Sequence, residues 1–336
     1  MVRNEFVKKS ARPTYERFIM TSLKQFDERN TALNRAEWDT RFKQLIRISC
    51  ERGWFLNPIE HPVYTFPTSG VQIIESTSAE IRDWDAASLC DAYKKVYQDL
   101  ADSWNGTVNP ERMRKQPSEM SRRIKDVAEF LGANLVGICE LNQKWVYKGS
   151  KVPQKYAISI AIEMDKDLLR NEPSYLENTA IGIAYSKARF VSTILAQYIR
   201  GIGYPAFANV NERVQEIPMA IDAGLGEVGR NGLLITPEYG PRVRLCSVTT
   251  DLPLSKDDPI DFGVQHHCEK CEKCAKACPA QAIRYGERTT EINNISNRKG
   301  LLRWPADCEK CLIFWGGDKS ERQSCSKCIS VCPFNK

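Results

Sequence analysis

The stretch Cys268-Glu-Lys-Cys271-Glu-Lys-Cys274-Ala-Lys-Ala-Cys278-Pro279 carries four cysteines at short, regular spacing and ends in a Cys-Pro pair. A second run, Cys325-Ser-Lys-Cys328-Ile-Ser-Val-Cys332-Pro333, ends in the same way. The 336-residue chain has 13 cysteines, and nine of them lie between residues 268 and 332. Thiolates are preferred ligands of soft metals and of iron–sulfur centres, so this clustering predicts a metal-binding module near the C-terminal end of the sequence.

The spacing within the first run distinguishes between the kinds of site that cysteines build. C-x2-C-x2-C-x3-C-P is the pattern of bacterial two-cluster ferredoxins, in which the fourth cysteine of each run binds the cluster of the other run. Structural zinc sites use separate C-x2-C pairs, and disulfide frameworks are typical of short secreted chains. The two runs therefore predict a ferredoxin-like module with two 4Fe-4S clusters, which transfer electrons one at a time.

The crossing pattern also assigns the cluster ligands. The first cluster takes three cysteines of the first run and one of the second: Cys268, Cys271, Cys274 and Cys332. The second cluster takes two cysteines of the second run and the last of the first: Cys325, Cys328 and Cys278. Its fourth ligand is Cys311 or Cys308. We favour Cys311, because the apolar residues 312–315 directly after it could shield a cluster.

The remaining cysteines are scattered singly, as small buried cysteines usually are: Cys50, Cys90, Cys139 and Cys246. The composition is that of a globular protein, with 42% hydrophobic residues and a net charge of +6. Lys and Arg are spread along the chain, so we expect no nucleic-acid partner. Five lysines lie among the cluster cysteines, where they form either a solvated face or a docking surface for an acidic electron donor: Lys270, Lys273, Lys276, Lys310 and Lys327.

Nothing in the sequence indicates a membrane span or a targeting segment. No stretch approaches the ~20 consecutive apolar residues that a transmembrane helix needs. Residues 1–9 contain neither a twin-arginine pair nor an apolar segment. We therefore expect a cytoplasmic protein, although the mature form of an exported, membrane-associated protein would have the same features.

Hydrophobic patterning divides the chain into three regions: residues 1–125, 126–261 and 262–336. The first is polar and mostly helical, and the last is the ferredoxin-like module. In the middle region the patterns favour helices over 122–133 and 174–202 and strands over 135–139, 156–164, 232–236 and 243–249. The middle is therefore an α/β or α+β core.

A glycine-rich segment, Gly224-Leu-Gly226-Glu-Val-Gly229, matches the G-x-G-x-x-G pattern of dinucleotide-binding sites. That site needs a strand before the glycines and a helix after them, whose N-terminus holds the pyrophosphate. Here Pro218 precedes the glycines, and Asn231-Gly232 leads into a predicted strand. We expect instead that the glycines let the backbone pack closely against another segment or a large cofactor.

Several segments in order carry a resemblance to a known family. They are Ala223-Gly-Leu-Gly-Glu-Val-Gly-Arg-Asn-Gly-Leu-Leu-Ile-Thr-Pro-Glu-Tyr-Gly-Pro-Arg-Val-Arg244, Thr250-Asp-Leu-Pro-Leu254, Pro259-Ile-Asp-Phe-Gly263, Cys311-Leu-Ile-Phe-Trp315 and Cys332-Pro-Phe-Asn-Lys336. With the two cysteine runs, this order resembles the corrinoid- and iron–sulfur-dependent reductive dehalogenases over about residues 125–336. Residues 1–125 match no motif, and the N-terminal region of the family is variable.

The resemblance implies an α+β fold, in which a nitroreductase-like α/β core binds base-off cobalamin and the substrate, followed by the ferredoxin-like module. It also implies an enzyme that cleaves the carbon–halogen bond of a small organohalide with Co(I). An external donor, either ferredoxin- or flavodoxin-like or quinol-linked, would reduce the clusters, which then reduce cobalt. The glycine-rich segment is assigned to the cofactor: Gly224, Gly226, Gly229 and Arg230. The chain has no Asp-x-His-x-x-Gly that would provide cobalt with an imidazole, which is compatible with the base-off form.

The resemblance further implies three catalytic residues. Tyr185 matches the proton donor of the family, and Arg244, which must be distinguished from its neighbour Arg242, matches the cation that stabilises the phenolate. Asn211 matches a polar position that contacts the substrate. The alternatives are that Tyr185 simply packs in the core and that Arg244 forms a structural ion pair.

Two departures and two rival interpretations accompany this resemblance. The chain lacks the twin-arginine leader of exported members, and members usually continue beyond Cys-Pro-Phe-Asn-Lys, so we expect a closing C-terminal segment to be absent. Epoxyqueuosine reductase also uses cobalamin and two clusters but acts on tRNA; its glycine segment differs, and this chain has no basic RNA-binding run. A non-catalytic electron-transfer subunit would use the clusters only as a relay.

Overall fold

A four-stranded antiparallel sheet forms the centre of the computed structural model, which describes residues 8–9, 15–42, 100, 103, 105–172, 174–316 and 325–336. The strands lie in the order β2 (Leu135–Glu140), β3 (Tyr156–Glu163), β7 (Val243–Thr250) and β4 (Ala206–Asn209). The register places Ile158 of β3 between Ile138 of β2 and Val248 of β7. β3 and β7 are therefore the inner strands, and both are eight residues long.

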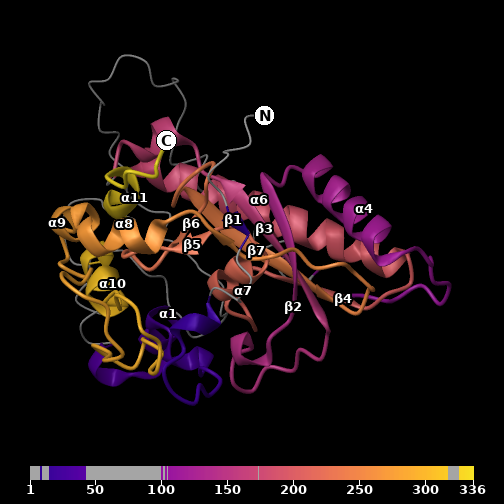
Figure 1. Ribbon diagram of the computed structural model, residues 1–336, viewed down its shortest axis with the longest axis horizontal. Helices are drawn as coiled ribbons and strands as arrows, with labels where there is room; N and C mark the ends of the chain where they lie inside the picture. Colours follow the sequence, from indigo (N-terminus) through magenta and orange to yellow (C-terminus); the bar gives the residue numbers. More distant parts are fainter. Residues whose placement is uncertain are drawn as a thin grey trace.

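Both faces of the sheet are buried, and the side chains of β3 alternate between them. Three isoleucines face one side (Ile158, Ile160 and Ile162), and two alanines face the other (Ala157 and Ala161). Helices α4 (Pro117–Phe130) and α6 (Tyr175–Gly201) cover the isoleucine side, and the short α7 (Glu216–Asp222) packs on the other side (Figure 1). Burial on both faces explains why β3 is a continuous apolar run and does not alternate with polar residues.

Helix α6 is the longest element of the described chain, and its two ends have clear local causes. Ser174 caps its N-terminus by accepting a hydrogen bond from the backbone N–H of Glu177. After Gly201, Gly203 adopts a φ of +94°, and a Cβ there would lie 2.3 Å from the carbonyl oxygen of Glu111. The helix packs on β3, β7 and β4, and it stops just before a position where only glycine fits.

The cysteine-rich part of the sequence, which contains both runs, folds as a helical module beside the sheet. Its elements are α8 (Val264–Lys270), α9 (Lys273–Ala277), α10 (Cys308–Gly316) and α11 (Lys327–Ser330). Figure 1 shows this module, in orange to yellow, on the side of the molecule away from α4. Helices α9 and α11 contact each other, so the two cysteine runs are side by side despite the sequence between them.

The described N-terminal residues pack against this module. The 3-10 turns η1 (Glu16–Phe18) and η2 (Glu28–Asn30) precede α1 (Ala32–Trp38), and β1 (Lys8–Lys9) pairs with β8 (Ile260–Asp261). Ile19 forms a β-bridge with Leu301, and the buried Arg35 forms an ion pair with Glu309 of α10. The sequence predicted a helical region here without a packing partner. Cys50, Cys90 and His61 lie outside the described residues.

Every helix and strand predicted for the middle region is present in the structure, with differences in bounds. The strand predicted over 232–236 is shorter, because only Leu234–Ile235 (β6) pairs with Glu227–Val228 (β5) in a small hairpin. The sequence patterns predict neither β4 nor α7. Pro218 lies in the first turn of α7, where a proline removes no helical hydrogen bond.

Truncating the isoleucine face should measure how much the central sheet contributes to stability. Ile160→Ala removes a side chain with 0% exposure from β3, and we expect it to lower the free energy of unfolding by about 2–5 kcal/mol. The matched control is Ile295→Ala, whose side chain is 46% exposed and should change stability by less than about 0.5 kcal/mol. Urea denaturation of both variants tests this, and equal losses would contradict the assignment of the core.

Candidate functional site

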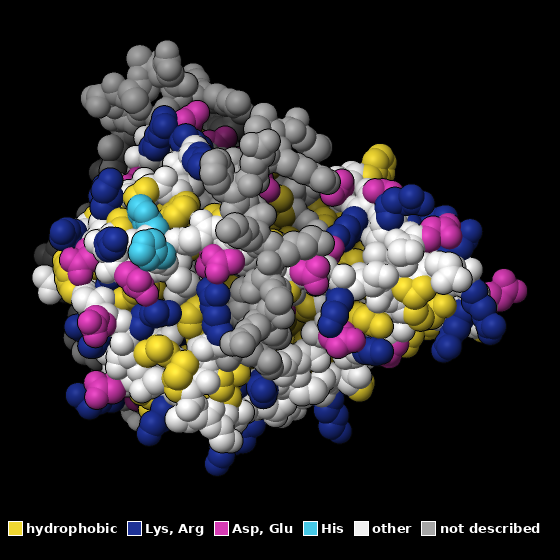
Figure 2. Space-filling view, in the orientation of Figure 1, with side chains coloured by type: hydrophobic (Ala, Val, Ile, Leu, Met, Phe, Trp, Pro, Cys, Tyr) yellow, Lys and Arg dark blue, Asp and Glu magenta, His cyan; other side chains and the backbone are white. Residues whose placement is uncertain are grey.

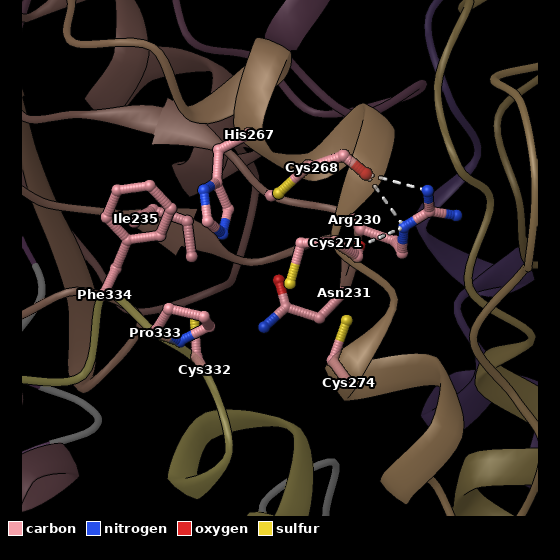
Figure 3. A pocket seen from close by; sticks show the side chains of 11 residues that line it. Arg230, Asn231, Ile235, His267, Cys268, Cys271, Cys274, Cys332, Pro333 and Phe334 are labelled. Carbon is pink, nitrogen blue, oxygen red and sulfur yellow. Dashed lines mark hydrogen bonds between the residues drawn. The ribbon is translucent and has the colours of Figure 1, made fainter.

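Four cysteines from both runs line one pocket between α8, α9 and the last residues of the chain (Figure 3). They are Cys268, Cys271, Cys274 and Cys332. Burial raises the pKa of Cys274 to about 12 and that of Cys332 to about 11. A thiolate is costly at such a place unless a metal cation neutralises it. The pocket thus brings together four thiols whose ionised forms would be favoured only by a bound metal centre.

A second group of thiols lies around Cys328. Burial raises the pKa of Cys328, and the neighbouring thiols of Cys311, Cys325, Cys274 and Cys278 raise it further. Cys308 lies one turn before Cys311 on α10 and donates a hydrogen bond to the carbonyl oxygen of Ala306 at 3.7 Å. The charged groups of Arg303, Asp307 and Glu309 act on the Cys308 thiol, and the Cys308 thiol in turn raises the pKa of Cys311.

The second thiol group adjoins the sheet domain. Cys328 packs against the same hydrophobic cluster as Tyr185 of α6. In the first turn of α6, Glu177 accepts a hydrogen bond from Ser326, which directly follows Cys325. Since Tyr185 follows Glu177 by eight residues, about 12 Å of helix separates this contact from Tyr185.

Tyr185, Asn211 and Arg244, predicted from three distant parts of the sequence, meet beside α6. Asn211, in the loop after β4, donates from Nδ2 to the Tyr185 hydroxyl at 3.4 Å. The Arg244 guanidinium carbon, on β7, lies 4.9 Å from the centre of the Tyr185 ring. The Nε of Arg244 is buried, and no hydrogen-bond partner for it occurs among the described residues. The structure therefore gathers all three side chains into one group with one buried donor unused.

Arg242, two residues before Arg244, has a different role. It forms an ion pair with Glu163, and it donates to the Asn335 side chain at 3.0 Å and to the Lys336 carbonyl at 3.2 Å. Arg242 thus holds the C-terminal residues against the sheet. The geometry separates the two arginines that the sequence left as neighbours.

The loop that carries Asn211 is held by the buried Glu216 and Arg189 and by the partly exposed Glu212, which the sequence patterns did not indicate. Asn211 has a φ of +69°, an uncommon conformation for a residue with a side chain. Its backbone N–H donates to the buried Glu216, whose carboxyl also accepts from Ser247 at 3.1 Å. Burial raises the pKa of Glu216 to about 8. Glu212 accepts from the Val210 N–H at 2.6 Å and pairs with Arg189. The available signal was two glutamates, four residues apart, beside apolar segments.

The three glycines of the G-x-G-x-x-G segment face other parts of the protein. A Cβ on Gly224 would lie 2.4 Å from the Asp258 carbonyl oxygen, and one on Gly226 would lie 2.1 Å from that of Ile235. A Cβ on Gly229 would lie 2.9 Å from the Asn231 side chain. The β5–β6 hairpin, and not a helix, follows the first two glycines. The segment is therefore a tightly packed turn without the helix N-terminus that a dinucleotide site requires.

Arg230 follows these glycines and lies in the wall of the first cysteine pocket (Figure 3). Its guanidinium donates to the carbonyl oxygens of Cys268 at 2.7 Å, Cys271 at 2.9 Å and both Arg284 and Gly286 at 2.9 Å. Its side chain also stacks on Trp304, with the guanidinium carbon 4.7 Å from the ring centre. Arg230 thus fastens the glycine-rich segment to the backbone of the first cysteine run.

Charged side chains on the face seen in Figure 2 are mixed in sign. Lys and Arg alternate with Asp and Glu over this face and do not gather into one basic area. Among the described residues, no helix has both the length and the apolar character that a membrane span requires.

Two family models match this chain. The model described as reductive dehalogenase subunit matches residues 102–254, and the 4Fe-4S double cluster binding domain matches residues 267–335. The second match contains all the cysteines of both runs, and the first contains Tyr185, Asn211 and Arg244.

Curated relatives agree with these matches. The tetrachloroethene reductive dehalogenase of Sulfurospirillum multivorans is 35% identical over 261 residues, which are 66% of this chain and 51% of that protein. One from Desulfitobacterium hafniense is 34% identical over 65% of this chain and 48% of its own length. An epoxyqueuosine reductase of Lactococcus garvieae is 32% identical over 36% of this chain. The chain spans about half the length of the dehalogenases it matches.

A solved structure extends the similarity to nearly the whole chain. The catabolic reductive dehalogenase NpRdhA, in complex with 3-bromo-4-hydroxybenzoic acid, superposes with a TM-score of 0.78 and 25% identity. The match covers 99% of this chain and 44% of NpRdhA. Together with the gathered thiols and the Tyr185 group, these similarities show that the chain belongs to the reductive dehalogenase family and ends in a 4Fe-4S double-cluster domain.

Proposed function

We propose that this chain catalyses reductive dehalogenation, in which a small organohalide takes up an electron pair and a proton and releases halide. The observation that carries the proposal is the meeting of Tyr185, Asn211 and Arg244 at the same hydrophobic core that Cys328 of the second thiol group contacts. The reaction requires a proton donor and a supply of electrons. Here the proposed donor, Tyr185, lies on α6, and the first turn of the same helix contacts Ser326 of the second cysteine run. A relay subunit would need only the thiol groups.

Tyr185 acts as the general acid. Its O–H bond breaks as the carbon that loses halide gains hydrogen, which leaves a phenolate. Asn211 donates to the phenolic oxygen, and Arg244 places a permanent positive charge against the ring. Both contacts stabilise the anion more than the neutral phenol, so they favour proton release. General acid catalysis of this kind contributes typically ~10²–10⁴ in rate.

The two thiol groups hold two 4Fe-4S clusters, with the crossed ligands that the spacing predicts. The shared pocket of Cys268, Cys271, Cys274 and Cys332 supports the first ligand set. Around Cys328, the position of Cys311 supports it as the fourth ligand of the second cluster over Cys308. An external donor, ferredoxin- or flavodoxin-like or quinol-linked, reduces the clusters. Such oxygen-sensitive centres fit a reducing compartment, and we infer a cytoplasmic location.

A base-off corrinoid would be held next to Tyr185. One solved relative, 25% identical with a TM-score of 0.75, is a reductive dehalogenase whose structure suggests a mechanism for B12-dependent dehalogenation. The buried Arg244 Nε provides an unused donor for an acceptor group at this place. When bound, the corrinoid supplies the reduced cobalt that breaks the carbon–halogen bond. The assignment of Gly224, Gly226 and Gly229 to the corrinoid stays a prediction, since their close contacts in the structure are with protein.

Removing the Tyr185 hydroxyl tests the proton donor. Tyr185→Phe keeps the ring under Arg244, and we expect halide release to fall by ~10²–10⁴ while the iron and corrinoid contents are unchanged. The assay measures halide from a chlorinated ethene and from a bromophenol. The control is Tyr198→Phe, on the same helix, which should keep full activity. Full halide release by Tyr185→Phe would overturn the assignment. Reduction of epoxyqueuosine tRNA without halide release by the wild type would favour the tRNA enzyme.

Replacing each of the two competing cysteines tests the ligands of the second cluster. We expect Cys311→Ser to lose about half of the bound iron and one of the two reduced-cluster signals in electron paramagnetic resonance, because one of two clusters lacks a ligand. Cys308→Ser should keep both, since its sulfur faces the Ala306 carbonyl. The reverse result would assign the ligand to Cys308.

A further inference from the structure

We propose that Arg230 is the counter-ion of the first cluster and raises its reduction potential. The inference rests on the proposed cluster ligands but not on the substrate or the corrinoid. Among the residues that line the first cysteine pocket, Arg230 is the one whose side chain carries a permanent charge. It is 1% exposed, so water does not screen that charge.

Among the residues that the structure describes, no carboxylate forms an ion pair with Arg230. All the acceptors of its hydrogen bonds are backbone carbonyl oxygens, which are dipoles and not anions: those of Cys268, Glu269, Cys271, Arg284 and Gly286. The buried carboxylate of the same hairpin, Glu227, pairs with Arg17 and accepts from two backbone N–H groups. A buried charge is costly without an opposite charge, so the site calls for an anion close to Arg230.

A 4Fe-4S cluster with four thiolate ligands is such an anion. Arg230 lines the pocket with all four cysteines, and two of the carbonyl groups that it binds belong to Cys268 and Cys271. The charge is thus fixed beside this cluster by the backbone of its own ligands. The contacts with Trp304 and with the carbonyl groups of Arg284 and Gly286 also prevent the guanidinium from turning away.

The sign of the effect follows from the charge change on reduction. When the cluster takes one electron from the donor, no bond forms or breaks, and the cluster becomes more negative. A fixed cation therefore stabilises the reduced cluster more than the oxidised one and raises the potential. Arg230 would make the first cluster easier to reduce than its thiolates and burial alone would allow.

The alternative is that Arg230 is only a fastener between the glycine-rich segment and the module. Arg242 offers a matched control for that role. It is also buried, at 4%, and it also donates to backbone carbonyl groups, those of Met164 and Lys336, but Glu163 neutralises it. Loss of Arg242 should therefore weaken packing without removing a net charge beside the cluster.

The test is a redox titration, followed by electron paramagnetic resonance, of the full chain reconstituted anaerobically with iron and sulfide. We expect Arg230→Gln to lower the potential of one cluster and leave the other unchanged. Arg230→Lys, which keeps the charge, should stay close to the wild type. Arg242→Gln should leave both potentials unchanged and lower only the thermal stability. Arg230→Met serves as the second neutral variant if Arg230→Gln takes up too little iron.

Two outcomes would overturn the proposal. One is an unchanged potential in a neutral Arg230 variant with full iron content, which would leave Arg230 as a fastener. The other is an equal fall in Arg230→Lys and Arg230→Gln, which would assign the effect to hydrogen-bond geometry. The titration needs neither organohalide nor corrinoid, so a failed dehalogenation assay does not affect it. Failure of the wild type to take up two clusters would instead overturn the ligand assignment itself.

Discussion

One buried guanidinium group, that of Arg230, joins the sheet domain to the cysteine-rich module. Arg230 belongs to the glycine-rich segment of the sheet domain, yet its hydrogen-bond partners all lie in the cysteine-rich module. These carbonyl groups belong to loops and to the end of α8, where no helix or sheet partner would satisfy them. Arg230 therefore solves two problems at once: it satisfies the backbone of the first cysteine run and fixes the distance between the module and the sheet.

The group formed by Tyr185, Asn211 and Arg244 depends on a different constraint, which is the packing of α6 on β7. Arg242 lies just before β7 and pairs with Glu163, whereas Arg244 lies within the strand and contacts Tyr185. Arg244 reaches the ring of Tyr185 on α6, which packs on β7. Asn211 reaches Tyr185 from a left-handed backbone conformation, and its backbone N–H donates a hydrogen bond to Glu216. A strand, a helix and one strained loop residue thus set the geometry.

Local features of the sequence predicted local features of the structure well. Three predictions used only neighbouring residues: the cysteine spacing, the apolar run of β3 and the amphipathic pattern of α6. The structure confirms the strand and the helix. What sequence patterns could not predict is contact between distant segments. Two such features join residues that are far apart in the sequence: the ion pair of Arg35 with Glu309 and the burial of Arg230. A third, the hydrogen bond from the Asn211 N–H to Glu216, depends on the conformation of a loop. The glycines matched a known pattern, but the atoms that they face could be identified only in three dimensions.

The crossed arrangement of the two cysteine runs has a consequence for biosynthesis. The pocket that contains Cys268 also contains Cys332, which lies 64 residues later in the chain. During translation the sheet can form once β7 has emerged, since all its strands precede residue 251. The metal pocket, in contrast, lacks a wall until Cys332, Pro333 and Phe334 have been made. Insertion of iron and sulfide into this pocket must then follow the synthesis of Cys332, when the sheet can already be folded.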